Sequence, residues 1–159
     1  MFDLKQNAKV GIVTGSASDK PIVDKVTSVL DEFGIIWEWN VLSAHRTPNK
    51  VAKYTQEAEG RGLQVLIGIA GLAAALPGVL AAHTLLPVIG VPGDGGPLSG
   101  VDALHSIVQM PPGIPVATVG IGNGKNAGYL AAHILALQDP QIHTKLKAYR
   151  KALGDIGES

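Results

Sequence analysis

The chain has 159 residues, with 13 basic and 13 acidic side chains and no cysteine. Hydrophobic residues make up 46% of the sequence and charged residues 16%, where soluble domains usually carry roughly 25% charged residues. Intrinsic disorder is excluded because it needs low hydrophobicity and high net charge. A net charge of zero argues against nucleic acid as the main partner, since that binding depends on a concentrated basic surface.

The same arithmetic indicates how the protein is organised. Its length fits one domain over residues 1–159, with a core over about 9–138 and a C-terminal helix over about 140–153. The first residues lack a basic segment followed by an apolar run, and Gly and Pro interrupt the longest apolar stretch. We therefore expect a cytoplasmic protein without a secretion signal or membrane span. With few charges to cover its surface, it is expected to hide apolar surface in a homo-oligomer.

Short apolar runs alternate along the chain with segments of helical periodicity, a pattern typical of a parallel sheet covered by helices on both faces. In chain order the predicted elements are a strand over 10–14, a helix over 22–33, a strand over 35–42, a helix from 48 to the glycines at 60–62, a strand over 65–70, a helix over 74–84, a strand over 88–91, a helix over 101–109, a strand over 116–120, and helices over 126–137 and 140–153. They predict an α/β fold, a three-layer αβα sandwich around a five-stranded parallel sheet of flavodoxin or Rossmann type.

Ligands of such sheets bind beyond the carboxyl ends of the strands, near the point where the strand order reverses. This rule selects the turns at 15–19, 43–48, 70–77 and 92–100 as the candidate site.

The first turn, Gly15-Ser16-Ala17-Ser18-Asp19, leads from a strand into a helix, so its hydroxyls and backbone N–H groups are placed to meet an anion. It has neither the GxGxxG pattern of dinucleotide sites nor the GxxxxGK[ST] pattern of ATP sites. The alternative is that Ser18 or Asp19 simply caps the helix.

The second turn, Ser43-Ala44-His45-Arg46-Thr47-Pro48, sets an imidazole beside a guanidinium. A histidine exchanges protons near neutral pH, and an arginine offers a planar fork for phosphate or carboxylate. The alternative is a surface His45 in a turn that only starts a helix, with Thr47 as its N-cap. Together with the first turn, however, this one predicts a crevice suited to a sugar phosphate and a proton-transfer step.

The remaining turns offer backbone groups rather than functional side chains. Small residues over 70–78 allow the chain to approach a ligand closely, or alternatively to pack against the sheet or another subunit. The loop over 93–98 is long and glycine-rich enough to cover the site. No His, Asp and Glu residues have the spacing of metal ligands, so no metal is proposed, and the glycines at 120–124 are weak evidence of a phosphate loop.

Four segments, taken in their order and spacing, resemble one known family. They are Gly15-Ser16-Ala17-Ser18-Asp19, Ser43-Ala44-His45-Arg46-Thr47-Pro48, Leu86-Pro87-Val88-Ile89-Gly90-Val91-Pro92 and Ser106-Ile107-Val108-Gln109-Met110-Pro111. On these motifs, over about residues 9–138, the chain resembles the N5-carboxyaminoimidazole ribonucleotide mutases, the mutase branch of the aminoimidazole ribonucleotide carboxylase family of purine biosynthesis.

The resemblance implies an isomerase that moves a carboxylate from nitrogen N5 to ring carbon C4 of a ribonucleotide, without ATP, metal or organic cofactor. The implied course is decarboxylation to aminoimidazole ribonucleotide and trapped CO2, attack by C4, and loss of the C4 proton. In this scheme His45 is the acid/base residue. Arg46 and Ser16 lie near the phosphate and Asp19 lies on the ribose. The resemblance also implies a homo-octamer with sites at subunit contacts. The expected substrate-binding residues are Ser16, Asp19, Arg46, Ser43, Ala44, Gly71, Ala74 and Leu76.

Two positions depart from the family pattern. Ala75 stands where family members commonly carry a second active-site histidine, and the turn over 122–125 is about two residues shorter than in many bacterial members. Two alternatives therefore stay open. One is the CO2-dependent carboxylase, a lyase, whose branch usually has Lys at the position of Arg46. The other is a non-catalytic nucleotide-binding module of flavodoxin-like fold, which Ala75 favours.

Overall fold

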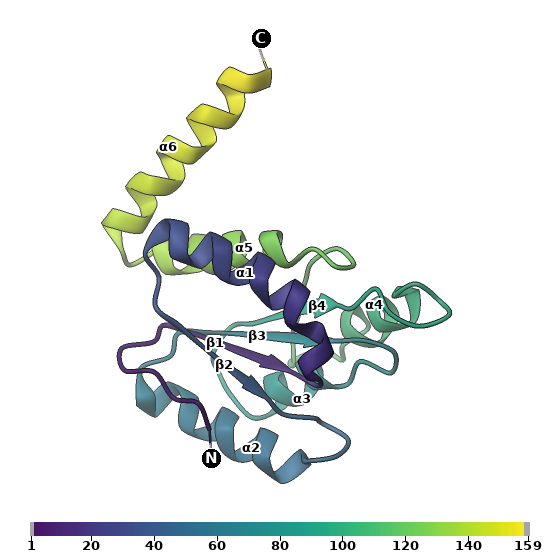
Figure 1. The fold of residues 1–159 in the computed structure, drawn as a ribbon. Coiled ribbons are helices and arrows are strands. Elements are labelled where there is room, and N and C mark those ends of the chain that lie inside the picture. Colours follow the sequence, from purple (N-terminus) through teal and green to yellow (C-terminus); the bar gives the residue numbers. More distant parts are fainter. Residues whose placement is uncertain (1, 158–159) are drawn as a thin grey trace.

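The computed structural model describes residues 2–157, in which a parallel sheet lies between two layers of helices (Figure 1). The sheet contains β1 (Val10–Thr14), β2 (Trp37–Val41), β3 (Val65–Ala70), β4 (Val88–Pro92) and β5 (Ala117–Thr118) in the order β2-β1-β3-β4-β5. The helices are α1 (Lys20–Phe33), α2 (Pro48–Ala58), α3 (Leu76–Ala82), α4 (Val101–Val108), α5 (Gly124–Ala136) and α6 (Pro140–Gly157), with short 3-10 turns η1 (Ala17–Asp19) and η2 (Glu59–Arg61). The predicted three-layer fold is confirmed, and its strand order is that of flavodoxin-like sheets.

The two faces of the sheet build two separate cores. Strands β1, β3 and β4 are buried at every position because helices cover both of their faces. One core lies under α1 and α5 and includes Ile12, Ile67 and Ile89, which are neighbours across three strands. The other core lies under α2, α3 and α4 and includes Val13 and Leu66. Successive residues of one strand thus serve opposite cores.

A buried carboxylate ties the edge strand β2 to the helix layer. Glu38 accepts hydrogen bonds from the Tyr54 hydroxyl (2.8 Å) and the Arg61 guanidinium (2.7 Å), and its other oxygen accepts from the Lys5 N–H (3.0 Å). A buried charge needs such partners, because the interior solvates it poorly. Burial, and after it the neighbouring Glu38 charge, raise the pKa of Tyr54 above its ordinary value.

The glycine-rich composition permits close approaches between elements. A Cβ at Gly128 of α5 would lie 2.8 Å from Val29 Cβ of α1, and a Cβ at Gly124 would lie 2.5 Å from the Ile22 carbonyl oxygen. Helices α1 and α5 therefore pack with almost no side chain between them at these points.

Several element boundaries differ from those predicted, and local hydrogen bonds explain two of them. Asn123 accepts from the Asn126 N–H (3.1 Å), so α5 begins two residues earlier than predicted. Ala75 N–H donates to the Ala73 carbonyl (2.8 Å), so a tight turn replaces the predicted start of α3. The predicted strand over 116–120 is reduced to the two residues of β5, and the last helix continues to 157 instead of 153.

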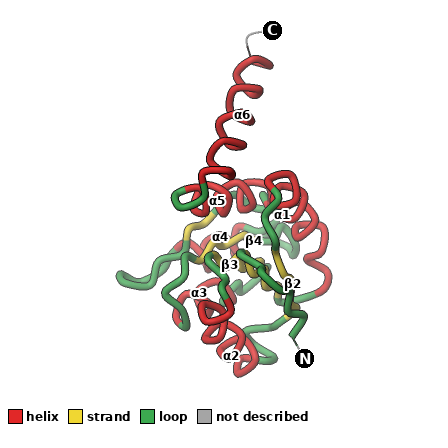
Figure 2. Tube along the Cα trace, turned by 90° about the vertical axis from the view of Figure 1, so that its left-hand side faces the viewer, coloured by secondary structure: helices red, strands yellow, loops and turns green. Residues whose placement is uncertain are grey.

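Helix α6 packs through its first half only. Ile142 and Leu146 are buried, Lys145 Nζ donates to the Phe33 carbonyl (2.8 Å), and the Tyr149 ring stacks on Tyr129 at 4.8 Å between centroids. The second half extends away from the body of the molecule (Figures 1 and 2). Within residues 2–157, no helix combines the length and the apolar character that crossing a membrane requires.

Gly11 provides a test of the close packing in the second core. A Cβ at this position of β1 would lie 2.6 Å from Tyr54 Oη and 2.8 Å from Leu66 Cδ2. We expect Gly11→Ala to lower the free energy of unfolding by about 2 kcal/mol, as overpacking of a rigid core does. Gly60→Ala is the matched control, since no heavy atom lies within 4 Å of its added Cβ. Urea unfolding followed by circular dichroism measures both, and equal stabilities would contradict the packing described.

Candidate active site

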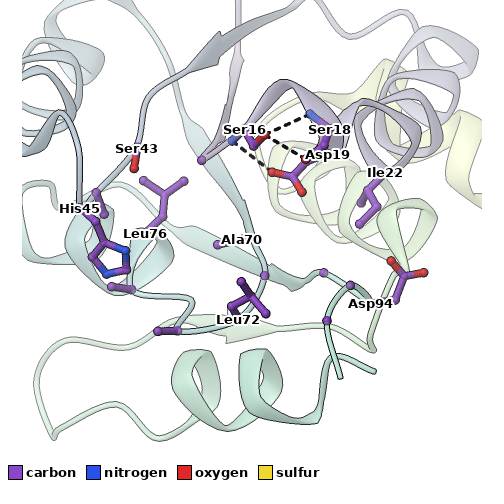
Figure 3. Close-up of a pocket in the computed structure, with 18 of the residues that line it drawn as sticks. Ser16, Ser18, Asp19, Ile22, Ser43, His45, Ala70, Leu72, Leu76 and Asp94 are labelled. Carbon is purple, nitrogen blue, oxygen red and sulfur yellow. Dashed lines mark hydrogen bonds between the residues drawn. The ribbon is translucent and has the colours of Figure 1, made fainter. Parts of the chain in front are cut away.

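A cavity of about 610 Å³ opens at the carboxyl ends of the strands, where the strand order reverses between β1 and β3. All four turns selected from the sequence contribute to its lining (Figure 3). The structure therefore has a cavity where the four turns were expected to meet. The lining residues are Gly15, Ser16, Ser18, Asp19, Pro21, Ile22, Ser43, Ala44, His45, Arg46, Ala70, Gly71, Leu72, Ala73, Ala75, Leu76, Gly93, Asp94, Gly95 and Gly96.

The turn after β1 is held by a reciprocal pair of hydrogen bonds. Ser16 Oγ accepts from the Ser18 N–H (3.2 Å), and Asp19 accepts from the Ser16 N–H (3.2 Å). Ser16 thus caps the 3-10 turn η1. Asp19 occupies the N-cap position of α1, one of the two positions suggested from the sequence, but its side chain makes no capping bond to that helix. Because the Ser16 and Ser18 N–H groups already have acceptors within the turn, they are not free to donate to a further anion.

Burial raises the pKa of the Asp19 carboxyl above its usual value, while the bond from the Ser16 N–H acts in the opposite direction. A carboxylate kept partly out of water at the wall of a cavity is costly for folding. Such a group is a candidate for ligand binding.

The turn after β2 is clamped by Thr47. Its hydroxyl accepts from the Ser43 N–H and donates to the Ser43 carbonyl, both at 3.1 Å, and Ser43 Oγ accepts from the Arg46 N–H at 3.2 Å. Thr47 occupies the predicted N-cap position of α2, but its side chain makes no capping bond to that helix. The hydroxyl instead closes the turn that presents His45 to the cavity.

Arg46 joins the first two turns. Its Nη2 donates to the Gly15 carbonyl at 2.8 Å, across the gap between β2 and β1. The structure thus brings together Ser16, Asp19, Ser43 and the 44–46 segment, as expected from the sequence.

The turn after β3 behaves differently from the expectation at one position. Gly71 and Leu76 line the cavity, although Leu76 is also buried in the second core. Ala74 is 1% exposed in the same core and does not line the cavity. Ala73 and Ala75 line the cavity instead, because the short turn before α3 directs alternate residues to opposite sides. Any contact of Ala74 with a ligand would have to involve its backbone.

Leu72 is a lining residue that the sequence did not indicate. Its backbone is left-handed, with φ of +55°, a conformation that costs a bulky residue about 1–2 kcal/mol. Its side chain is nevertheless 54% exposed, so burial does not offset that cost. A run of small residues gave no signal for this strain, since only the backbone geometry reveals it.

The cavity has a polar side and an apolar side. Hydroxyls, the His45 imidazole and the Arg46 guanidinium come from the turns after β1 and β2, and alanine and leucine side chains come from the turn after β3. Asp94, which the sequence placed only in a covering loop, adds a second carboxylate to the lining (Figure 3). Among residues 2–157, no three His, Asp or Glu side chains gather in the way metal ligands do.

Comparison with protein families decides the relationship. The model of the AIR carboxylase family matches residues 9–155. The chain belongs to the AIR carboxylase family. The match reaches farther than the resemblance seen in the motifs, which stopped near residue 138, and so includes most of α6.

Individual AIR carboxylase relatives agree with this assignment. The N5-carboxyaminoimidazole ribonucleotide mutase of Pyrococcus abyssi is 55% identical over 143 residues, 90% of this chain and 82% of the relative. The phosphoribosylaminoimidazole carboxylase of Schizosaccharomyces pombe is 48% identical over 98% of this chain, which spans 29% of that longer protein. The crystal structure of Treponema denticola PurE superposes with a TM-score of 0.85 at 33% identity, covering 92% of this chain and 91% of the other.

Asp19 should reveal its burial in the pH dependence of folding. The pKa of Asp19 is higher in the folded protein than in the unfolded chain. The stability that the protonated carboxyl contributes is therefore fully present below the pKa of the unfolded chain, and it is lost as the pH rises through the pKa of the folded protein. Asp19→Asn removes that ionisation and keeps an acceptor for the Ser16 N–H. We expect the variant to match the wild type near about pH 3 and to exceed it near about pH 7 by less than about 1 kcal/mol, since water screens a half-exposed carboxylate.

Urea unfolding across this pH range measures the difference between the Asp19→Asn variant and the wild type. The matched control is Asp155→Asn, which removes an exposed carboxylate on the second half of α6 that does not line the cavity. A stability difference for Asp19→Asn that stays constant with pH would refute the assignment.

Proposed function

We propose that this chain is an N5-carboxyaminoimidazole ribonucleotide mutase, an isomerase of purine biosynthesis that moves a carboxylate from N5 to C4. The observation that carries this proposal is the convergence of the His45-Arg46 turn and the Ser16-to-Asp19 turn on one cavity. Membership of the AIR carboxylase family and the 55% identical mutase support the same activity. Because the substrate itself carries the carboxylate that is moved, the transfer needs no separate carboxyl donor.

The charges of the cavity orient the substrate. Asp19 and Asp94 repel a phosphate, whereas the Arg46 guanidinium attracts it, so the phosphate is expected on the Arg46 side together with Ser16. The Asp19 carboxylate is then free to accept hydrogen bonds from ribose hydroxyls. Ser43, Ala44, Gly71 and Leu76 form the remaining wall of the proposed substrate site, with Ala74 behind them.

The chemistry needs one proton given and one proton taken. When the bond between N5 and the carboxylate breaks, its electron pair stays on nitrogen, His45 donates a proton there, and CO2 is released in the cavity. Ring carbon C4 then attacks CO2, and His45 removes the C4 proton, which restores its starting state. His45 is the one imidazole that lines the cavity within residues 2–157, and Ala75 supplies no second one.

The carboxylase is the second candidate, favoured by the name of the Schizosaccharomyces pombe relative. It would use aminoimidazole ribonucleotide and CO2 directly. Purified protein is therefore supplied either with N5-carboxyaminoimidazole ribonucleotide or with aminoimidazole ribonucleotide and bicarbonate, and the C4-carboxylated product is followed. Product from the first substrate without added bicarbonate supports the mutase. Product from the second alone indicates the carboxylase, and no product from either leaves a nucleotide-binding module.

His45→Asn is expected to abolish turnover while leaving ribonucleotide binding nearly unchanged, because Asn keeps the polar shape but cannot shuttle the proton. A loss of about 100-fold or more in kcat is the result expected for a general acid/base. Calorimetric titration with the product ribonucleotide provides the binding control. Activity like that of the wild type would remove His45 from the mechanism.

We also propose that the protein is cytoplasmic and assembles into a homo-oligomer, an octamer by its resemblance to the family. Exposed leucines support an assembly, since Leu85 and Leu137 are 95% and 84% exposed in the single chain, and the second half of α6 lies free of the body. Light scattering of the purified protein measures the mass, and a monomer would contradict the proposal.

A further inference from the structure

Leu72 has three properties that a purely structural residue would not combine. Its backbone is left-handed with φ of +55°, its side chain is 54% exposed, and it lines the cavity. The other non-glycine residues with positive φ among residues 2–157 are Asn7 and Ser99, and leucine tolerates this conformation least of the three. Local strain that burial does not offset is characteristic of functional positions.

The strained backbone brings the Leu72 side chain against the covering loop. A Cβ at Gly96 would overlap Leu72 Cδ2, so the leucine fits only because Gly96 has no side chain. Behind this contact, the Gly93 N–H donates to the Ala70 carbonyl at 2.8 Å and fixes the start of the loop beside the turn after β3. In Figure 3 the Leu72 side chain stands between those of His45 and Asp94.

The apolar wall around Leu72 matches one stage of the proposed reaction. Between the breaking of the bond at N5 and the formation of the bond at C4, CO2 is neutral and is bound to nothing. Such a molecule is retained by a dry apolar wall and not by hydrogen bonds. Leu72, Leu76, Ala73 and Ala75 form that wall, and Leu72 is the large member that is exposed at it.

We propose that Leu72, held by its strained backbone against Gly96, is the residue that retains CO2 in the cavity. The inference rests on the proposed mutase function and deepens it. Leu72 does not exchange protons, so its removal should change the fate of CO2 more than the breaking of the bond at N5. The reaction then stops at aminoimidazole ribonucleotide, with the nitrogen protonated and CO2 lost to solvent.

The experiment uses N5-carboxyaminoimidazole ribonucleotide labelled with ¹³C in the carboxylate, in unlabelled bicarbonate buffer. Carbonic anhydrase is added so that escaped labelled CO2 mixes rapidly with the unlabelled pool. Two quantities are measured, the label kept in the C4 product and the ratio of aminoimidazole ribonucleotide to that product. A blank without protein corrects for spontaneous decarboxylation. Wild-type protein is expected to retain most of the label.

Leu72→Ala is expected to raise the ratio of aminoimidazole ribonucleotide to C4 product about tenfold, because the substitution removes the isopropyl group from an apolar pocket. Leu72→Gly keeps the left-handed backbone without strain and should show the same escape, so it tests the side chain even if the alanine variant folds poorly. Leu72→Met should restore much of the retention. Leu98→Ala is the matched control, because Leu98 is 58% exposed in the covering loop that contacts Leu72 but does not line the cavity.

The outcomes separate the two proposals. Label retention in Leu72→Ala and Leu72→Gly equal to that of the wild type would overturn the role of Leu72 and leave the mutase intact. Unlabelled product or no product from the wild type would overturn the mutase itself. If Leu98→Ala releases as much CO2 as Leu72→Ala, retention belongs to the covering loop as a whole. That result would also overturn the specific role of Leu72.

Discussion

Parallel pairing of all five strands is the constraint on which the rest of this molecule depends. Strands that run in one direction end at one edge, so the turns after β1, β2, β3 and β4 meet there whatever their separation in sequence. Parallel pairing also requires both faces to be covered, which explains the two cores and the completely buried β3. The site and the core are therefore two consequences of the same topology.

The polar side of the cavity is positioned by hydrogen bonds within and between turns. The Ser16 and Asp19 pair closes one turn, Thr47 closes the next, and Arg46 links them through the Gly15 carbonyl. Each of these groups is held in place before any ligand binds, so binding costs little additional conformational entropy. A preorganised set of donors and acceptors of this kind favours orientation of a small substrate over broad electrostatic attraction.

The apolar side follows a different principle. Glycine and alanine bring backbones close together, both where α5 meets α1 and where the covering loop meets the turn after β3. At that second contact Leu72 adopts a backbone conformation that leucine disfavours. The same cavity is lined by the Asp19 carboxylate, whose partial burial also opposes folding. Two unfavourable features at one cavity indicate that stability is given up there for function.

Local sequence patterns determined the elements, the fold and the edge at which the site lies. Apolar runs of strand length and helical spacing are short-range signals, and the parallel-sheet rule then places the turns with His45 and Asp19 together. Tertiary structure alone decided which small residues face the cavity, since one turn before α3 sends Ala74 inward to the core and Ala75 outward. It alone placed Asp94 in the lining and strained Leu72 against Gly96, because backbone torsions and contacts between separate loops leave no periodicity in the sequence.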